Sequence, residues 1–121
     1  IGEGKADTQK LLFDVQMELG NYPEALKNLE AIRDMNDFDY LIRLAKWNDH
    51  LGDLNTAITF MEKAKDIAEK ENSKVLKIWS YSNLGDFYGH VGRIQKSYDC
   101  YLKTLAIDPN YSYALNYIIP A

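Results

Sequence analysis

The chain has 121 residues, of which 46% are hydrophobic and 26% charged, a composition typical of one folded domain with a modest core. Its formal net charge is −4, and residues 1–60 carry 6 Lys or Arg against 11 Asp or Glu. This balance excludes the basic footprint expected of a nucleic-acid-binding protein and argues against binding to an anionic membrane surface. No apolar run has the length needed for insertion across a membrane.

Cysteine usage and the first residue bear on the compartment. Cys100 is the single cysteine, which excludes an intrachain disulfide and argues against a cysteine-based zinc site. A lone cysteine is compatible with a reducing compartment and favours the cytoplasm. A processed exported protein is the open alternative, because a removed signal sequence would leave no trace. The chain begins with Ile1 rather than Met, so we expect it to be a piece of a longer protein.

The first 37 residues predict a pair of helices. Apolar residues at helical spacing cover about residues 5–19 and again 22–35. Gly20 stands between them, where a residue without a Cβ can take the left-handed conformation that ends a helix. Asn21 is expected to cap the second helix, with Pro23 and Glu24 in its first turn. The Gly-Lys pair near the N-terminus lacks the spacing of a phosphate loop, and we expect a frayed tail there.

The next stretch predicts a second pair, with helices over about 38–51 and 54–71. Gly52 joins them in the same apolar–Gly–polar–apolar order that surrounds Gly20. Asp37 and Asp39 come at the start of the first of these helices, where the helix dipole favours acidic side chains, so we do not interpret them as a catalytic pair. Asn72 and Ser73 are expected to separate this pair from the next.

The remaining residues predict a third pair, with helices over about 75–91 and 94–107 joined at Gly92. The turn around Pro109 stops the second helix of this pair. A last short helix is expected over 111–119, with Leu115 and Ile118 in register and no polar capping helix after it. We find no alternating pattern typical of strands.

Gly20, Gly52 and Gly92 are 32 and 40 residues apart, a period that points to stacked helical repeats. Residues 78–111 resemble a tetratricopeptide repeat along its full length. The positions that match are Tyr81, Leu84, Gly85, Tyr88, Gly92, Ser97, Tyr101, Thr104 and Pro109. The two earlier units resemble this repeat less closely, with Asn48 in place of the usual Tyr and Phe13 in place of a small residue.

The resemblance implies an all-α fold, a right-handed superhelical stack of antiparallel helix pairs. About three repeats, over residues 5–37, 38–73 and 75–111, would be followed by a partial fourth or capping helix over 111–119, all in one domain. Gly85 and Ser97 are expected to lie where helices approach closely, because a larger side chain would overpack the contact. At least three such pairs are needed to bury a continuous core.

The first helices of the pairs share one face, and this face carries the expected function. In this family they line a concave groove, and such grooves are typical of non-enzymatic scaffolds that bind a protein or peptide partner. The candidate binding residues in register are Lys10, Arg43, Lys46, His50, Trp79, Asn83, Asp86 and His90. Lys and Arg would fix a carboxylate of an extended or helical peptide. The alternative interpretation is a solvated charged face without a ligand.

Some members of the family hold the acidic C-terminal tails of heat-shock chaperones in a clamp of two Lys, two Asn and one Arg. Here the clamp would occupy positions 10, 14, 43, 79 and 83, and only Lys10 matches. Asp14 stands in place of an Asn and would repel a carboxylate, and Trp79 stands in place of a Lys. The sequence therefore argues against a chaperone clamp.

Other functions find less support in the sequence. His50 and His90 occupy the same repeat position, but no third ligand stands beside them, so we expect no metal site and no other cofactor. Cys100 faces away from both histidines in register, which argues against a nucleophilic pair and against an enzyme. The alternative to a binding scaffold is a structural segment of a longer repeat protein, forming homo-oligomers through its apolar C-terminal end near Leu115 and Ile118.

Overall fold

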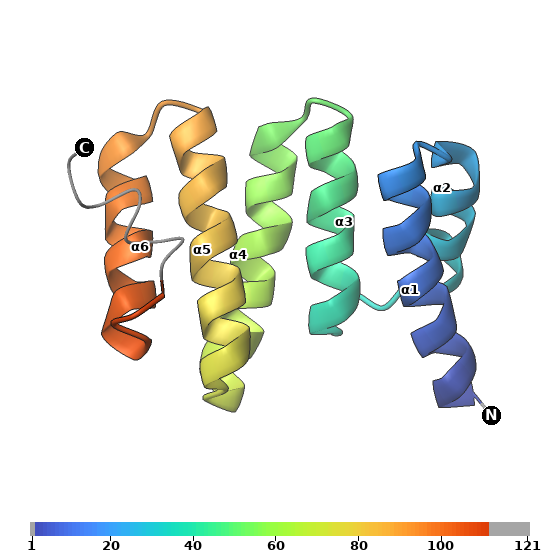
Figure 1. The fold of residues 1–121 in the computed structure, drawn as a ribbon, viewed down its shortest axis with the longest axis horizontal. Coiled ribbons are helices and arrows are strands. Elements are labelled where there is room, and N and C mark those ends of the chain that lie inside the picture. The colour runs from blue at the N-terminus through green and yellow to red at the C-terminus, as the bar shows by residue number, and fades with distance from the viewer. Residues whose placement is uncertain (1, 112–121) are drawn as a thin grey trace.

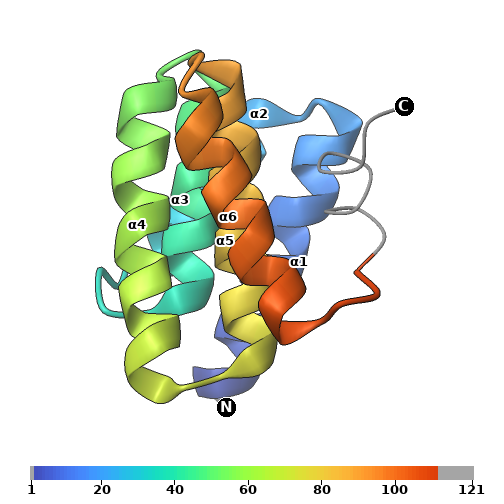
Figure 2. The same ribbon diagram turned by 90° about the vertical axis from the view of Figure 1, so that its left-hand side faces the viewer.

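The computed structural model describes residues 2–111, with side chains described from residue 6 onward. Six helices make up this part of the chain: α1 (Gly2–Leu19), α2 (Tyr22–Ala31), α3 (Phe38–His50), α4 (Leu54–Glu71), α5 (Lys74–His90) and α6 (Ile94–Ile107). They form antiparallel pairs in a row that begins with α1 and ends with α6 (Figure 1). Seen from the α6 end, α4 lies along one side of the stack and α1 along the other (Figure 2). The last helix expected from the sequence lies beyond Tyr111, outside the described residues.

The glycines end their helices as predicted. Gly20, Gly52 and Gly92 have φ angles of +76°, +83° and +82°, in the left-handed region. The next N–H then closes back on the carbonyl five residues earlier, as from Arg93 to Tyr88 at 2.8 Å. The two helices of each pair are therefore connected by the same kind of turn, which contains a left-handed glycine.

Three local predictions were wrong. Helix α1 begins at Gly2 instead of following a frayed tail, and no proline stands in its first turn. Asn21 makes no side-chain bond to α2, whose first turn contains a proline and so presents one N–H fewer to cap. Helix α2 ends at Ala31 instead of residue 35. The Asp34 carboxylate accepts the N–H of Asn36 at 3.0 Å, which turns the chain before α3.

The core is divided into two apolar clusters. The larger one lies between α3, α4 and α5 and centres on Leu41, Met61 and Leu84, each at most 2% exposed. The smaller one joins α1 and α2 and centres on Phe13 and Leu29, with Tyr40 of α3 packed against it. Helices α2 and α3 otherwise touch only slightly, whereas every other pair of consecutive helices makes extensive contact. The first helix pair is therefore the most loosely attached unit of the described stack.

The close approach expected at Gly85 is present between α5 and α6. A Cβ at Gly85 would lie 2.8 Å from two ring carbons of Tyr101, which is itself 2% exposed. The Ser97 hydroxyl donates to the Gly85 carbonyl at 2.7 Å, and the Tyr101 hydroxyl donates to the Asp86 carboxylate. Small residues at this contact allow the two helix backbones to meet.

Candidate functional site

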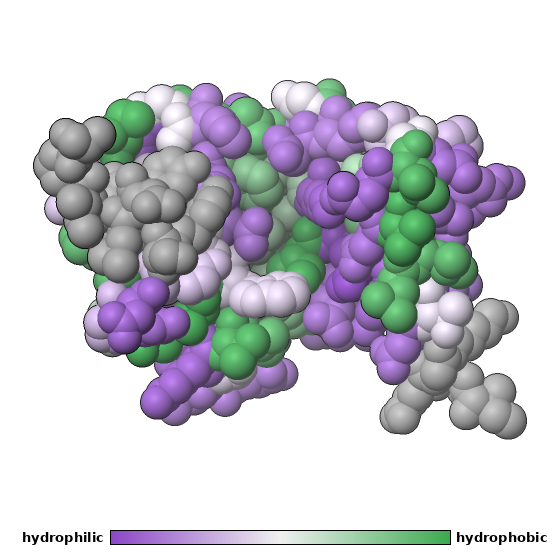
Figure 3. Space-filling view, viewed as in Figure 1, coloured by the Kyte–Doolittle hydropathy of each residue, from purple (hydrophilic) through white to green (hydrophobic). Residues whose placement is uncertain are grey.

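A cavity of about 500 Å³ opens between the first helices of the three pairs, and we refer to it as the groove. Its lining residues are Asp14, Glu18, Ile42, Arg43, Lys46, Asp49, Met61, Trp79, Asn83, Asp86, Phe87 and His90. Figure 3 shows the corresponding face hollowed between α5 and α1, with hydrophobic atoms in the depth of the hollow and hydrophilic atoms around it. Six of the eight candidate residues from the sequence line this groove, and Lys10 and His50 are not among its lining residues.

The floor of the groove is apolar and its rim carries an exposed indole. Met61 and Phe87, at 2% and 7% exposure, close the groove from below. Register reasoning missed both, because buried positions at helical spacing indicate the core rather than a surface. Trp79 is 51% exposed, and the Asn83 amide donates to the Trp79 carbonyl at 2.7 Å. A large apolar side chain thus lies half-exposed at the edge of an apolar hollow.

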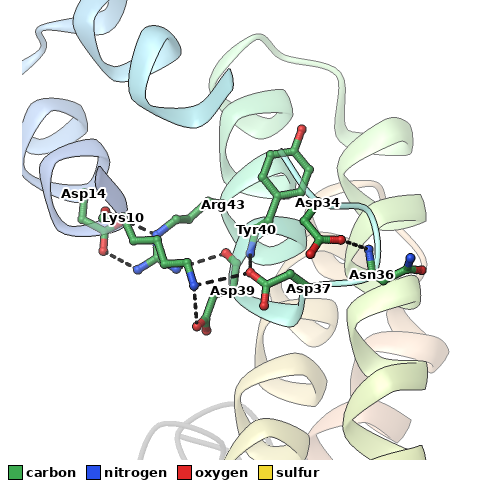
Figure 4. Close-up of polar contacts among 8 residues, drawn as sticks. All are labelled: Lys10, Asp14, Asp34, Asn36, Asp37, Asp39, Tyr40 and Arg43. Atoms are coloured by element: carbon green, nitrogen blue, oxygen red, sulfur yellow. Dashed lines mark hydrogen bonds and ion pairs between the residues drawn. The ribbon is translucent and has the colours of Figure 1, made fainter. Parts of the chain in front are cut away.

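Arg43, which the sequence nominated as an anion-binding residue, is engaged within the chain (Figure 4). One terminal nitrogen donates to the Asp14 carboxylate at 2.9 Å, and the other donates to the Asp39 carbonyl at 3.0 Å. The Nε donates to the Lys10 carbonyl at 3.4 Å. All three guanidinium nitrogens therefore join α3 to α1 or to the first turn of α3 itself.

Lys10 is held in the same polar bridge (Figure 4). Its ammonium lies 3.3 Å from an Asp39 oxygen and 3.5 Å from an Asp37 oxygen, and only 17% of its side chain is exposed. Burial acts to lower the pKa of the Lys10 ammonium, but the hydrogen bond and charges of Asp39 and Asp37 outweigh it and raise the pKa. Lys10 stays charged, and its charge is compensated by two carboxylates.

The charges that line the groove are mostly acidic. Four carboxylates and two cations line it, a formal balance of −2 with His90 neutral. Glu18, Lys46 and Asp49 are exposed, and within residues 6–111 no hydrogen bond or ion pair engages their charged groups. Asp86 accepts a hydrogen bond from the Tyr101 hydroxyl. The charges that face solvent in the groove therefore include two open carboxylates and one open ammonium.

The two histidines occupy different surroundings despite their common repeat position. His50 stacks on Tyr22 of α2 with ring centroids 4.0 Å apart, and Trp47 lies 5.4 Å away. His90 lines the groove and also a second cavity of about 350 Å³ between α5 and α6. In the described part of the chain, no three His, Cys, Asp or Glu side chains gather closely enough to hold a metal ion.

Cys100 is half-buried on α6. Burial and the neighbouring charge of Glu62 raise the pKa of the thiol to about 11. At neutral pH the side chain is therefore a protonated thiol, which is a poor nucleophile.

Among the described residues, no helix is both long and apolar enough to cross a bilayer.

Comparison with known proteins places this arrangement in a family. The structure resembles two crystal structures of MamA, at 23% and 22% identity with TM-scores of 0.73 and 0.72. These matches cover 93% and 97% of this chain, but the chain spans only 64% and 62% of the MamA chains. It also resembles the first TPR of Spaghetti (RPAP3) bound to the HSP90 peptide SRMEEVD, at 18% identity and a TM-score of 0.76, over 95% of this chain and 88% of that one.

At these identities the structural likeness shows the fold alone. No curated protein matches the sequence. The family model for the tetratricopeptide repeat matches residues 38–71 and 80–111, which together make up more than half of the chain. The chain belongs to the tetratricopeptide repeat family.

Proposed function

We propose that this domain is a protein-interaction module that holds a peptide segment of its partner in the groove between α1, α3 and α5. The observation that carries the proposal is the half-exposed ring of Trp79 beside the apolar floor of Met61 and Phe87. Interface residues that contribute most to binding are enriched in Trp and sit at apolar hollows surrounded by polar groups. The related fold of RPAP3 holds a short peptide, which supports a segment rather than a folded surface as the ligand.

The side chains of the groove can bind and orient a ligand, and we propose no reaction there. Its polar rim contains the carboxylates of Glu18 and Asp49 and the ammonium of Lys46. No described residue pairs with these three charged groups, so each can contact a ligand. An extended segment presents alternate side chains to such a rim and floor. The proposal therefore assigns a partner and no substrate, and it includes no cofactor.

Substitution of Trp79 tests the proposal. Peptides of twelve residues are selected from a random display library for binding to the purified chain. Their affinities for the parent and for the Trp79→Ala variant are then measured by fluorescence anisotropy. We expect the selected peptides to bind the variant about 30-fold more weakly, since a central Trp contributes about 2 kcal/mol to an interface. Tyr98→Ala is the matched control, because Tyr98 is an aromatic residue of 41% exposure that does not line the groove. Peptides that bind both variants and the parent equally would place the binding surface elsewhere.

A second candidate function is self-association, and an apolar stripe on α1 favours it. Leu11, Leu12, Val15 and Leu19 are 41% to 76% exposed and form a hydrophobic band along α1 in Figure 3. Leu115 and Ile118, near which the sequence predicts such a contact, lie outside the described part of the chain. The described stack thus presents an unpartnered apolar face at its α1 end.

Light scattering at several concentrations tests self-association through α1. We expect a weight-average mass that rises with concentration in the parent and stays at the monomer value in the double variant Val15→Lys and Leu19→Lys. Lys27→Ala and Lys63→Ala, which alter exposed residues of α2 and α4, serve as the control. A parent that stays monomeric at every concentration would remove this candidate and leave the groove proposal untouched.

A further inference from the structure

The charges around the groove point to the kind of segment that it binds. This inference rests on the proposed function, since it concerns the ligand of the same groove. The three guanidinium nitrogens of Arg43 bond to Asp14 and to two carbonyls, and its side chain is 14% exposed. Lys10 is compensated by Asp37 and Asp39. Of the two cations that line the groove, Arg43 and Lys46, only Lys46 is therefore available to pair with an anionic ligand.

Two acidic side chains of the groove lie at one edge of the stack. Helices α1, α3 and α5 run in the same direction, so their C-terminal ends at Leu19, His50 and His90 lie at one edge of the stack (Figure 1). Helices α2, α4 and α6 begin at the same edge, at Tyr22, Leu54 and Ile94, so the opposite dipoles of each antiparallel pair largely cancel there. Glu18 and Asp49 are the residues just before two of these ends, and both line the groove. The negative potential of this edge therefore comes from the two carboxylates.

We propose that the groove binds a cationic segment of a partner protein, one with Lys or Arg side chains. The cations of the segment lie beside Glu18 and Asp49, at the C-terminal edge of α1, α3 and α5. An apolar or aromatic side chain of the segment covers the Trp79 ring, and an Arg at this position would also stack on the indole face. The preference is opposite in sign to the acidic peptide SRMEEVD held by the RPAP3 domain of the same fold.

The composition of the selected peptides separates this inference from the proposed function. Peptides from the random library are first sorted by whether Trp79→Ala weakens their binding. We expect those that depend on Trp79 to be enriched in Lys and Arg over the starting library. Peptides that depend on Trp79 but are neutral or acidic would overturn the cationic preference while supporting the groove as the binding site. A selection without any peptide that depends on Trp79 would overturn both.

Charge reversal in the groove gives a second measurement on the enriched peptides. The double variant Glu18→Lys and Asp49→Lys is expected to bind them at least about tenfold more weakly, since two attractive exposed pairs become repulsive. Binding to the parent should also weaken from about 0.1 M to about 1 M salt, as the Debye length falls from about 10 Å to about 3 Å. The control is Glu30→Lys and Glu71→Lys, which changes the net charge equally at exposed residues outside the groove. Equal loss in both double variants would reduce the preference to a net-charge effect and overturn the assignment to Glu18 and Asp49.

Discussion

Replacing Gly85 with leucine is expected to lower the free energy of unfolding by about 3 kcal/mol, the upper end of the range for an overpacked helix contact. The Cβ alone would lie 2.8 Å from the Tyr101 ring, and the rest of the leucine side chain needs more room. The ring has little freedom to withdraw, because Tyr101 is 2% exposed and its hydroxyl bonds to Asp86. Thermal unfolding followed by circular dichroism should show a midpoint lower by about 10 °C for a domain of this size.

Substituting Gly85 in a variant without the Tyr101 ring tests whether this ring causes the loss of stability. Alanine at Gly85 gains about 1 kcal/mol in helix propensity but meets the same ring, so it should be neutral or destabilising in the parent. In a Tyr101→Leu background the ring is gone, and Gly85→Ala should then raise the midpoint above that of Tyr101→Leu alone. The same effect of Gly85→Ala in both backgrounds would refute the close contact as the reason for this glycine.

The features that sequence reasoning predicted well are those set by one or two residues. A glycine with positive φ ends its helix through local geometry, and this held at Gly20, Gly52 and Gly92. The need for a small residue at Gly85 follows from a repeat register that fixes which helices touch. The end of α2 was not predicted, because it depends on whether Asp34 turns toward the N–H of Asn36.

For the groove, the repeat register predicts which residues lie together but not which of them are already paired. The structure brings six of the residues that register selected to one cavity: Arg43, Lys46, Trp79, Asn83, Asp86 and His90. It could not show that Arg43 and Lys10 are already compensated, because their partners come from another helix or from the residue before α3. The sign of the ligand charge depends on these pairings, so the sequence alone predicted an anionic ligand, whereas we propose a cationic one.

Replacing Arg43 with methionine is expected to loosen the first helix pair without unfolding the rest. Arg43 and Lys10 bridge α3 to α1 at a junction where α2 and α3 touch only slightly. Loss of partly buried hydrogen bonds to a charged group costs about 2 kcal/mol, which corresponds to about 30-fold faster amide exchange in α1. In a stack stabilised by neighbouring units, the amides of α4, α5 and α6 should keep their protection. Hydrogen exchange resolved by residue measures both.

Lys46→Met is the matched control for this junction, since it removes a positive charge from the same helix at a residue without a partner in the described structure. It should leave exchange in α1 unchanged, whereas equal effects of the two variants would trace the loosening to net charge instead of the bridge. High salt should narrow the difference between Arg43→Met and the parent only in part, because the Arg43 side chain is mostly buried. Since the bridge holds α1, which carries Glu18, against α3, which carries Asp49, its loss should also weaken binding of the cationic peptides. Arg43 would then serve the groove by positioning its acidic edge and not by touching the ligand.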